Sequence, residues 1–125
     1  MGAPIRVLLV EDNDIFRESL SFLLGTYVDV DVVGSVALGG AAARATAELQ
    51  ADVVVIDYRL PDVDGTEVAR EVREARPEAS VVFLSASVGK DERDAAKIAA
   101  APLVGKDAGM DALVEAVRAV SGSST

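Results

Sequence analysis

Side chains suited to phosphate and metal chemistry stand at the ends of four apolar runs in this chain. Glu11 and Asp12 follow one run, and Asp57 ends another. Ser85 and Lys106 each follow a further run. A hydroxyl can donate to a phosphoryl oxygen, and lysine is a common phosphate binder. Carboxylate oxygens suit Mg²⁺, which takes only one or two of them directly.

The three acids divide into ligands and a nucleophile if they lie together. Asp12 and Asp57 would bind Mg²⁺ directly, and Glu11 would act through water. The remaining oxygen of Asp57 could then act as a nucleophile and form an aspartyl-phosphate. Three neighbouring carboxylates repel one another, so we expect at least one raised pKa when no cation is bound. A bound divalent ion offsets that repulsion and neutralises charge that develops during phosphoryl transfer.

The apolar runs are predicted to be strands buried on both faces. They are rich in Val, Ile and Leu and nearly continuous, which is typical of a parallel sheet. Helical spacing of apolar or Ala-rich residues fills the segments between them. The expected strands are 5–10, 30–33, 53–56, 81–84 and 103–104, and the expected helices are 16–27, 37–49, 68–75, 91–100 and 110–120.

Five alternating strands and helices predict an α/β sandwich with a parallel sheet and right-handed crossovers. In such folds the ligand crevice lies at the carboxyl ends of the strands, where all the residues singled out above should meet. We expect one domain over residues 1–121. Residues 122–125 are small and polar, and we expect a flexible tail or the start of a linker.

Composition excludes several classes of site. The formal net charge of −9 argues against a general nucleic-acid-binding surface. The chain has no Cys and no His, so thiolate and imidazole chemistry are excluded. No apolar run reaches the roughly 18 residues of a membrane span, and the first residues lack a signal-peptide layout. A cytoplasmic protein is the default expectation.

Each of these residues also has a simpler interpretation. Residues 11–13 could cap the first helix, and Asp57 could start a turn before Pro61. Ser85 could cap a strand end, and Lys106 could be solvated. Together, the simpler interpretations need four coincidences at the one edge where α/β sites form.

With these residues in view, the chain resembles the receiver domain of bacterial two-component response regulators over roughly residues 5–120. The motifs that carry the resemblance are VLLVEDND, DYRLPDVDG from Asp57, LSAS around Ser85 and VGKDA around Lys106. The resemblance implies a flavodoxin-like (βα)5 fold with a doubly wound five-stranded parallel sheet, a three-layer sandwich. The KDA triplet looks most like regulators with a C-terminal helix-turn-helix output domain.

The resemblance also implies a role for each residue of the site. Asp57 would receive a phosphoryl group from a sensor histidine kinase. Glu11 and Asp12 would hold Mg²⁺ together with Asp57, and Arg59 would add its backbone carbonyl. The domain would then be no enzyme toward other substrates, because it promotes only its own phosphorylation and dephosphorylation.

Signal transmission in the family implies further roles. Ser85 would be the switch hydroxyl and Lys106 the phosphoryl-binding lysine. Phosphorylation would re-pack the face made by the expected helix 91–100, strand 103–104 and helix 110–120, and the same face could form a homodimer. Transcription would be regulated, and DNA bound, only through an output domain that is not in this chain.

Three departures from the family pattern affect how the signal would be transmitted. Leu103 replaces the usual aromatic residue or His three positions before Lys106. The spacing from Ser85 to Lys106 is about one residue shorter than in the family. Pro102 lies in the connection before the last strand, so we expect that connection to be altered. Arg59 and Ser87 stand where side chains can influence how water reaches the phosphoryl group, so we expect them to modulate dephosphorylation.

Three other functions remain as alternatives. A haloacid-dehalogenase-like Mg²⁺ phosphohydrolase would use Asp57 and Lys106, but it needs a second Asp where Arg59 stands. A flavodoxin-like cofactor module needs a phosphate loop after the first strand, where the sequence is acidic. A degenerate receiver would act only as a protein-binding module.

Overall fold

A computed structural model describes residues 2–122. A five-stranded parallel sheet lies at its centre, with strand order β2-β1-β3-β4-β5. The strands are β1 (Ile5–Val10), β2 (Val30–Val36), β3 (Val53–Asp57), β4 (Ser80–Ser85) and β5 (Leu103–Gly105). The parallel sheet and the alternating order confirm the fold predicted from the sequence.

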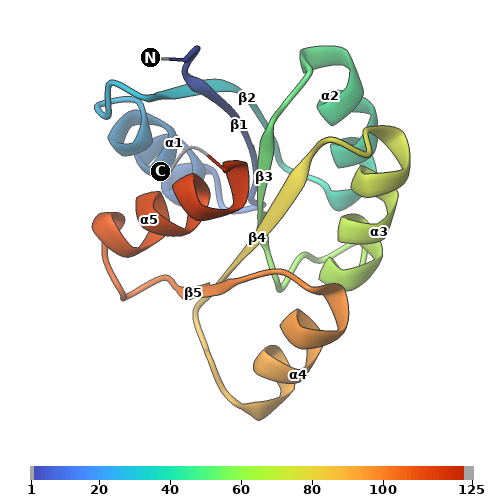
Figure 1. Ribbon diagram of the computed structural model, residues 1–125. Helices are drawn as coiled ribbons and strands as arrows, with labels where there is room; N and C mark the ends of the chain where they lie inside the picture. The colour runs from blue at the N-terminus through green and yellow to red at the C-terminus, as the bar shows by residue number, and fades with distance from the viewer. Residues whose placement is uncertain (1, 123–125) are drawn as a thin grey trace.

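Helices cover both faces of this sheet, which makes three layers (Figure 1). The helices are α1 (Asp14–Leu24), α2 (Ala42–Leu49), α3 (Gly65–Ala75), α4 (Lys90–Ala99) and α5 (Met110–Ser121). One apolar cluster joins the sheet to α1 and α5, and a second joins it to α2, α3 and α4. The sheet is therefore doubly wound.

Strand β3 shows why the apolar runs are continuous. All five of its residues are buried, with Val53 and Val55 in one cluster and Val54 and Ile56 in the other. Successive side chains of a strand point to opposite faces, so a strand covered on both faces must be apolar throughout. Its last residue is Asp57, which is thereby held at the carboxyl edge of the sheet.

Four element boundaries differ from the expectation by three residues or more, among them the end of α1 at Leu24 and the start of α3 at Gly65. Strand β2 continues to Val36, and its pairing with β1 shifts register between Val7 and Leu8. As an edge strand it is only partly buried, so its apolar pattern is weak. Helix α2 begins after a 3-10 turn at Gly39–Ala41 instead of at residue 37. The Asp62 carboxylate binds the backbone N–H groups of that turn, which fixes the turn to the loop after β3.

The connection from α4 to β5 is short and contains Pro102. Helix α4 ends at Ala99, and Ala100 adopts a left-handed conformation with φ 54°. The backbone N–H of Ala101 then donates to Ala96, and the Pro102 carbonyl accepts from Phe83 in β4. Only Ala101 and Pro102 therefore separate the cap residue from the first residue of β5.

The last described element is α5, which ends at Ser121. Gly122 is the C-cap of α5, with φ 78°. The rest of the expected tail at 122–125 lies outside the described residues. No helix within residues 2–122 is long and apolar enough to cross a membrane.

Candidate functional site

The loop after β1 separates helix capping from the acidic pair. Asn13 is the N-cap of α1, and its side chain accepts a hydrogen bond from the Phe16 N–H at 2.9 Å. The capping interpretation of residues 11–13 thus holds for Asn13. Glu11 is 2% exposed, and its carboxylate accepts from the Asn13 N–H at 3.0 Å. Asp12 is exposed beside it, so neither acid is used as the cap.

Three carboxylates meet at the carboxyl edge of the sheet, as predicted. Glu11, Asp12 and Asp57 each offer an oxygen atom, and these oxygens all lie within 4.8 Å of one another. Asp57 is 6% exposed at the end of the central strand β3. The order of the strands places β1 beside β3, which explains how residues 46 positions apart come together.

Lys106 brings a positive charge to the same cluster. Its Nζ lies 2.8 Å from Glu11 Oε1 and 3.4 Å from Asp57 Oδ2. Its backbone N–H donates to the Ser85 carbonyl at 2.8 Å, which anchors the loop after β5 to the end of β4. Lys106 is therefore held at the site, and the solvated interpretation does not apply.

Phe16 is a site neighbour that the sequence did not identify. Lys106 Nζ lies 4.5 Å from the centroid of the Phe16 ring, a cation–π contact. The available signal was the position of Phe16 on the apolar stripe of the expected helix, but that stripe was interpreted as core alone. The ring packs one side of the ammonium group while the carboxylates hold the other.

Ser85 lies one strand away from Asp57. It ends β4 and is fully buried, and β4 pairs with β3. Its Oγ accepts a hydrogen bond from the Ser87 N–H at 3.3 Å. The hydroxyl is thus at the correct edge of the sheet and is engaged by its own loop.

Arg59 contributes a backbone contact to the site and sends its side chain elsewhere. Its N–H donates to Asp57 Oδ1 at 3.1 Å. Its guanidinium donates to Glu92 Oε2 at 2.8 Å, in the first turn of α4. No sequence signal distinguished Glu92 from other surface acids of an amphipathic helix.

Burial and charge together shift the protonation of the cluster. The pKa of Asp57 is raised to about 6, with burial as the largest cause and the Glu11 carboxylate as a further one. The Arg59 N–H and the Lys106 charge oppose this shift. The pKa of Lys106 is raised: burial, the largest influence, lowers it, but its contacts with Glu11 and Asp57 outweigh that effect. The expected raised pKa is confirmed, although burial exceeds repulsion as its cause.

The donor set fits a divalent cation. Glu11 Oε1 is buried and accepts no hydrogen bond from the described residues, because its 2.8 Å approach to Lys106 lacks hydrogen-bond geometry. The cluster thus has three carboxylates against one ammonium. Hard oxygen ligands of this kind suit Mg²⁺, which needs only one or two protein carboxylates and keeps water as its other ligands.

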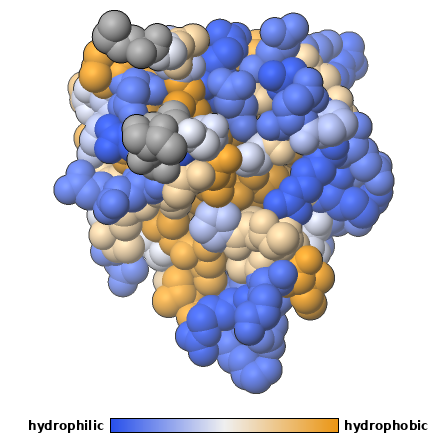
Figure 2. Space-filling model, viewed as in Figure 1, coloured by the Kyte–Doolittle hydropathy of each residue, from blue (hydrophilic) through white to orange (hydrophobic). Residues whose placement is uncertain are grey.

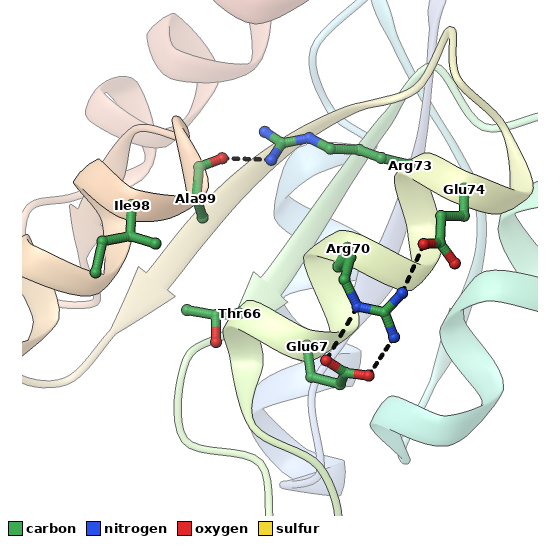
Figure 3. Close-up of a pocket in the computed structure, with 7 residues that line it drawn as sticks. All are labelled: Thr66, Glu67, Arg70, Arg73, Glu74, Ile98 and Ala99. Carbon is green, nitrogen blue, oxygen red and sulfur yellow. Dashed lines mark hydrogen bonds and ion pairs between the residues drawn. The ribbon is translucent and has the colours of Figure 1, made fainter.

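A second hollow lies away from this cluster, between α3 and α4 (Figure 3). Its two arginines already have partners. Arg70 pairs with Glu67 and Glu74, and Arg73 donates to the carbonyls of Ala99 and Ala100 at the end of α4. Arg73 thus links α3 to the end of α4, and neither arginine of the hollow is left without a partner for a ligand to bind.

Known proteins are similar to this chain in sequence and in fold. Residues 7–118 match the family described as the response regulator receiver domain. The chain is 35% identical over 89 residues to the response regulator protein VraR of Staphylococcus saprophyticus, an overlap of 71% of this chain and 43% of VraR. It is 29% identical over 119 residues to the response regulator GacA of Pseudomonas aeruginosa, an overlap of 93% of this chain and 55% of GacA.

A solved structure agrees along nearly the whole chain. The signal receiver domain of NarL from Mycobacterium tuberculosis matches with a TM-score of 0.88 at 30% identity, over 97% of this chain and 98% of that domain. The chain spans about half the length of the curated relatives VraR and GacA. Since the family match covers most of the described residues, the chain belongs to the response regulator receiver domain family of two-component systems.

Proposed function

We propose that this domain is a phosphoacceptor switch in which Asp57 receives a phosphoryl group from a sensor histidine kinase. The observation that carries the proposal is the convergence of Glu11, Asp12 and Lys106 on Asp57. Asp57 is buried by the sheet, yet the groups around it are those that a phosphoryl group and a cation need. Membership of the receiver family supports the same function.

The side chains divide the chemistry of transfer. A carboxylate oxygen of Asp57 attacks phosphorus, the bond from phosphorus to the donor breaks, and the donor leaves with the bonding electrons. Lys106 lies 3.4 Å from Asp57 Oδ2, close enough to follow the new phosphoryl oxygens with its ammonium group. Ser85 would turn its hydroxyl from the Ser87 N–H toward the phosphoryl group. That turn is the event that biases the domain toward a second state.

Mg²⁺ would be held by Asp12, Asp57 and the Arg59 carbonyl, with Glu11 acting through water. Bound there, it neutralises charge that develops on the transferring group. The Arg59 N–H already holds Asp57 Oδ1, so the backbone of this loop is fixed beside the acceptor. Glu11 supports the proposal through its buried oxygen without a hydrogen bond, which a hydrated cation would satisfy.

The wider role is proposed from the relatives. VraR and GacA are named response regulators, and this chain spans about half of each. We therefore infer a cytoplasmic receiver domain over residues 1–121, with 122–125 leading to an output domain that regulates transcription. DNA would be bound by that output domain and not by this one. A homodimer would form through the face of α4, β5 and α5.

The hydrolase and the binding-only alternatives have less support. A haloacid-dehalogenase-like enzyme needs an Asp as acid/base at the position of Arg59. The guanidinium at this position is instead bound to Glu92. A degenerate receiver would not need the acid, lysine and serine set. Leu103 is half-buried against the α4 side of the sheet, so an exposed aromatic readout is not available at that position.

Phosphorylation can be tested by the intact mass of the protein. Incubation with acetyl phosphate and Mg²⁺ should add one phosphoryl group, and Asp57→Asn should abolish the addition because the amide is not a nucleophile. Asp91→Asn is the matched control, since Asp91 is exposed in α4, and it should be phosphorylated normally. Failure of the wild type to gain the adduct from this donor or from any kinase would support the binding-only alternative. Continuous turnover of phosphate esters without an adduct would support the hydrolase.

A further inference from the structure

Glu92 is a buried acid that the proposed chemistry does not use. It is 3% exposed, and the only other buried residue of α4 is Ala96. The rest of this helix is largely hydrophilic at the surface (Figure 2). A buried carboxylate is costly unless it is paired and hydrogen-bonded. The partners of Glu92 therefore decide how the start of α4 is held.

The Glu92 carboxylate forms an ion pair with Arg59. Oε2 accepts a hydrogen bond from the Arg59 guanidinium at 2.8 Å. The Glu92 side chain of this ion pair is 4% exposed, and the Arg59 side chain is 67% exposed. The Ser87 hydroxyl lies beside the carboxylate and helps to lower the pKa of Glu92. Gly89 leaves room for this arrangement, since a Cβ there would lie 3.2 Å from Glu92 Oε1. The contact with Arg59 is the largest cause of the lowered pKa of Glu92.

The two residues beside Glu92 also bind the reacting residues. The Arg59 N–H donates to Asp57 Oδ1, and the Ser87 N–H donates to Ser85 Oγ. Hydrogen bonds thus run from the acceptor through Arg59 to α4, and the Ser87 residue beside Glu92 holds the switch hydroxyl. Glu92 is the residue through which α4 takes part in these contacts.

We propose that Glu92 is a positioning residue that holds the Arg59 guanidinium against α4 and away from the phosphoryl group on Asp57. This inference rests on the proposed phosphoacceptor function. With the guanidinium held on α4, water keeps access to the phosphoryl group. Without Glu92, the guanidinium turns to the phosphoryl oxygens, which are then the strongest nearby acceptors, and it blocks the attacking water. Glu92 therefore sets the lifetime of the signal.

The first test is the lifetime of the phosphorylated protein. Protein loaded with acetyl phosphate and Mg²⁺ is desalted into Mg²⁺ buffer, and loss of the phosphoryl group is followed by intact mass. Glu92→Gln keeps the shape of the side chain but removes its charge, and we expect the lifetime to lengthen by at least about threefold. Asp91→Asn removes the same charge from the same helical turn, where the side chain is exposed, and should leave the lifetime unchanged.

A double-mutant cycle separates positioning from a general structural effect. In an Arg59→Gln background the guanidinium is gone, so Glu92→Gln should no longer change the lifetime. Equal lengthening in both backgrounds would overturn the proposal. A lifetime of Glu92→Gln equal to that of the wild type would overturn it as well.

The second test needs no phosphorylation, so it separates failure of this inference from failure of the proposed function. Amide hydrogen exchange of the unphosphorylated protein reports how firmly the first turns of α4 and the Arg59 N–H are held. We expect Glu92→Gln to speed exchange at residues 93–96 and at Arg59 by at least about threefold, and Asp91→Asn to leave it unchanged. If the wild type takes up no phosphoryl group, the proposed function fails, and this exchange result alone decides the role of Glu92. Unchanged exchange in Glu92→Gln would overturn it.

Discussion

The folded structure raises the pKa of Asp57 above that of an ordinary carboxyl group. Asp57 lies at the end of a fully buried strand, and the Glu11 carboxylate is its neighbour. Lys106 and the Arg59 N–H partly offset the cost of keeping the Asp57 carboxylate charged. The pKa of Asp57 nevertheless stays raised, at about 6. The residue that should react is therefore also a residue that strains the fold while the site holds no cation.

Removing the charge of Asp57 should stabilise the domain. Without Mg²⁺ at pH 7, Asp57→Asn should raise the free energy of unfolding by about 1–3 kcal/mol, because a buried and repelled carboxylate becomes a neutral amide. Urea denaturation with EDTA present measures the change. Asp91→Asn is the exposed control and should stay within about 0.5 kcal/mol of the wild type. Equal or lower stability of Asp57→Asn would contradict the raised pKa.

The same group predicts a pH dependence of stability. The pKa of Asp57 rises from an ordinary 3.8 to about 6 on folding, so the folded state binds the proton more tightly than the unfolded state does. Its contribution is therefore fully present below the ordinary pKa and is lost as pH rises through the folded pKa. The stability advantage of Asp57→Asn over the wild type should grow between about pH 4 and pH 6.5 and then level off. A constant difference across urea titrations at these pH values would argue against it.

At the scale of elements, the ends of α4 are held differently from its middle. Its first turn is tied through Glu92, and its last turn through Arg73, which donates to the carbonyls of Ala99 and Ala100. Ala100 then takes a left-handed conformation that glycine adopts more readily. The short connection between α4 and β5 therefore contains local strain at Ala100.

Relieving that strain should stabilise the protein. Ala100→Gly should raise the free energy of unfolding by about 0.5–1 kcal/mol, because φ 54° costs glycine nothing sterically. Ala99→Gly is the matched control one residue earlier, at the last helical residue of α4, and should lower stability by about 0.5–1 kcal/mol. Urea denaturation of both variants gives the comparison. A loss of stability in Ala100→Gly would show that the cap is not strained.

The elements also show what the sequence could predict. Strand β3 and the residues at the strand ends were predictable, because burial on both faces leaves a continuous apolar run and parallel strands share one carboxyl edge. The full length of β2 was not, since an edge strand is held by backbone pairing that leaves little apolar signal. The roles of Phe16 and Glu92 were not predictable either, because each depends on a contact with a residue far along the chain, Lys106 or Arg59.

At the scale of the whole molecule, the charge of −9 and the acidic cluster act in the same direction. An excess of negative charge opposes the compact state through self-repulsion. General salt screens this repulsion everywhere, whereas Mg²⁺ should in addition bind one place in the fold. Stability in the two kinds of salt therefore distinguishes a binding site from a merely acidic surface.

Mg²⁺ should stabilise the domain more than KCl does at the same ionic strength. Binding to the folded state alone adds RT ln(1 + [L]/Kd), or about 1.4 kcal/mol at ten times the dissociation constant. Thermal unfolding in MgCl₂ and in matched KCl measures the excess. Asp12→Asn removes the charge of an exposed acid that is proposed as a ligand, and it should abolish the excess while it keeps the response to KCl. Identical curves in the two salts would argue against a metal site at these acids.

The packing of Tyr58 has a practical consequence for following the domain. The chain contains no Trp and two Tyr, and Tyr58 directly follows Asp57 and packs edge-on against Phe83 with ring centroids 6.0 Å apart. The other, Tyr27, donates its hydroxyl to the Asp111 carboxylate at 3.0 Å, a contact that quenches tyrosine emission. Most of the intrinsic fluorescence should therefore come from a ring one residue from the acceptor. We therefore expect metal binding and phosphoryl uptake to change the emission of Tyr58, so that a fluorimeter would follow both events in the native protein without an attached dye.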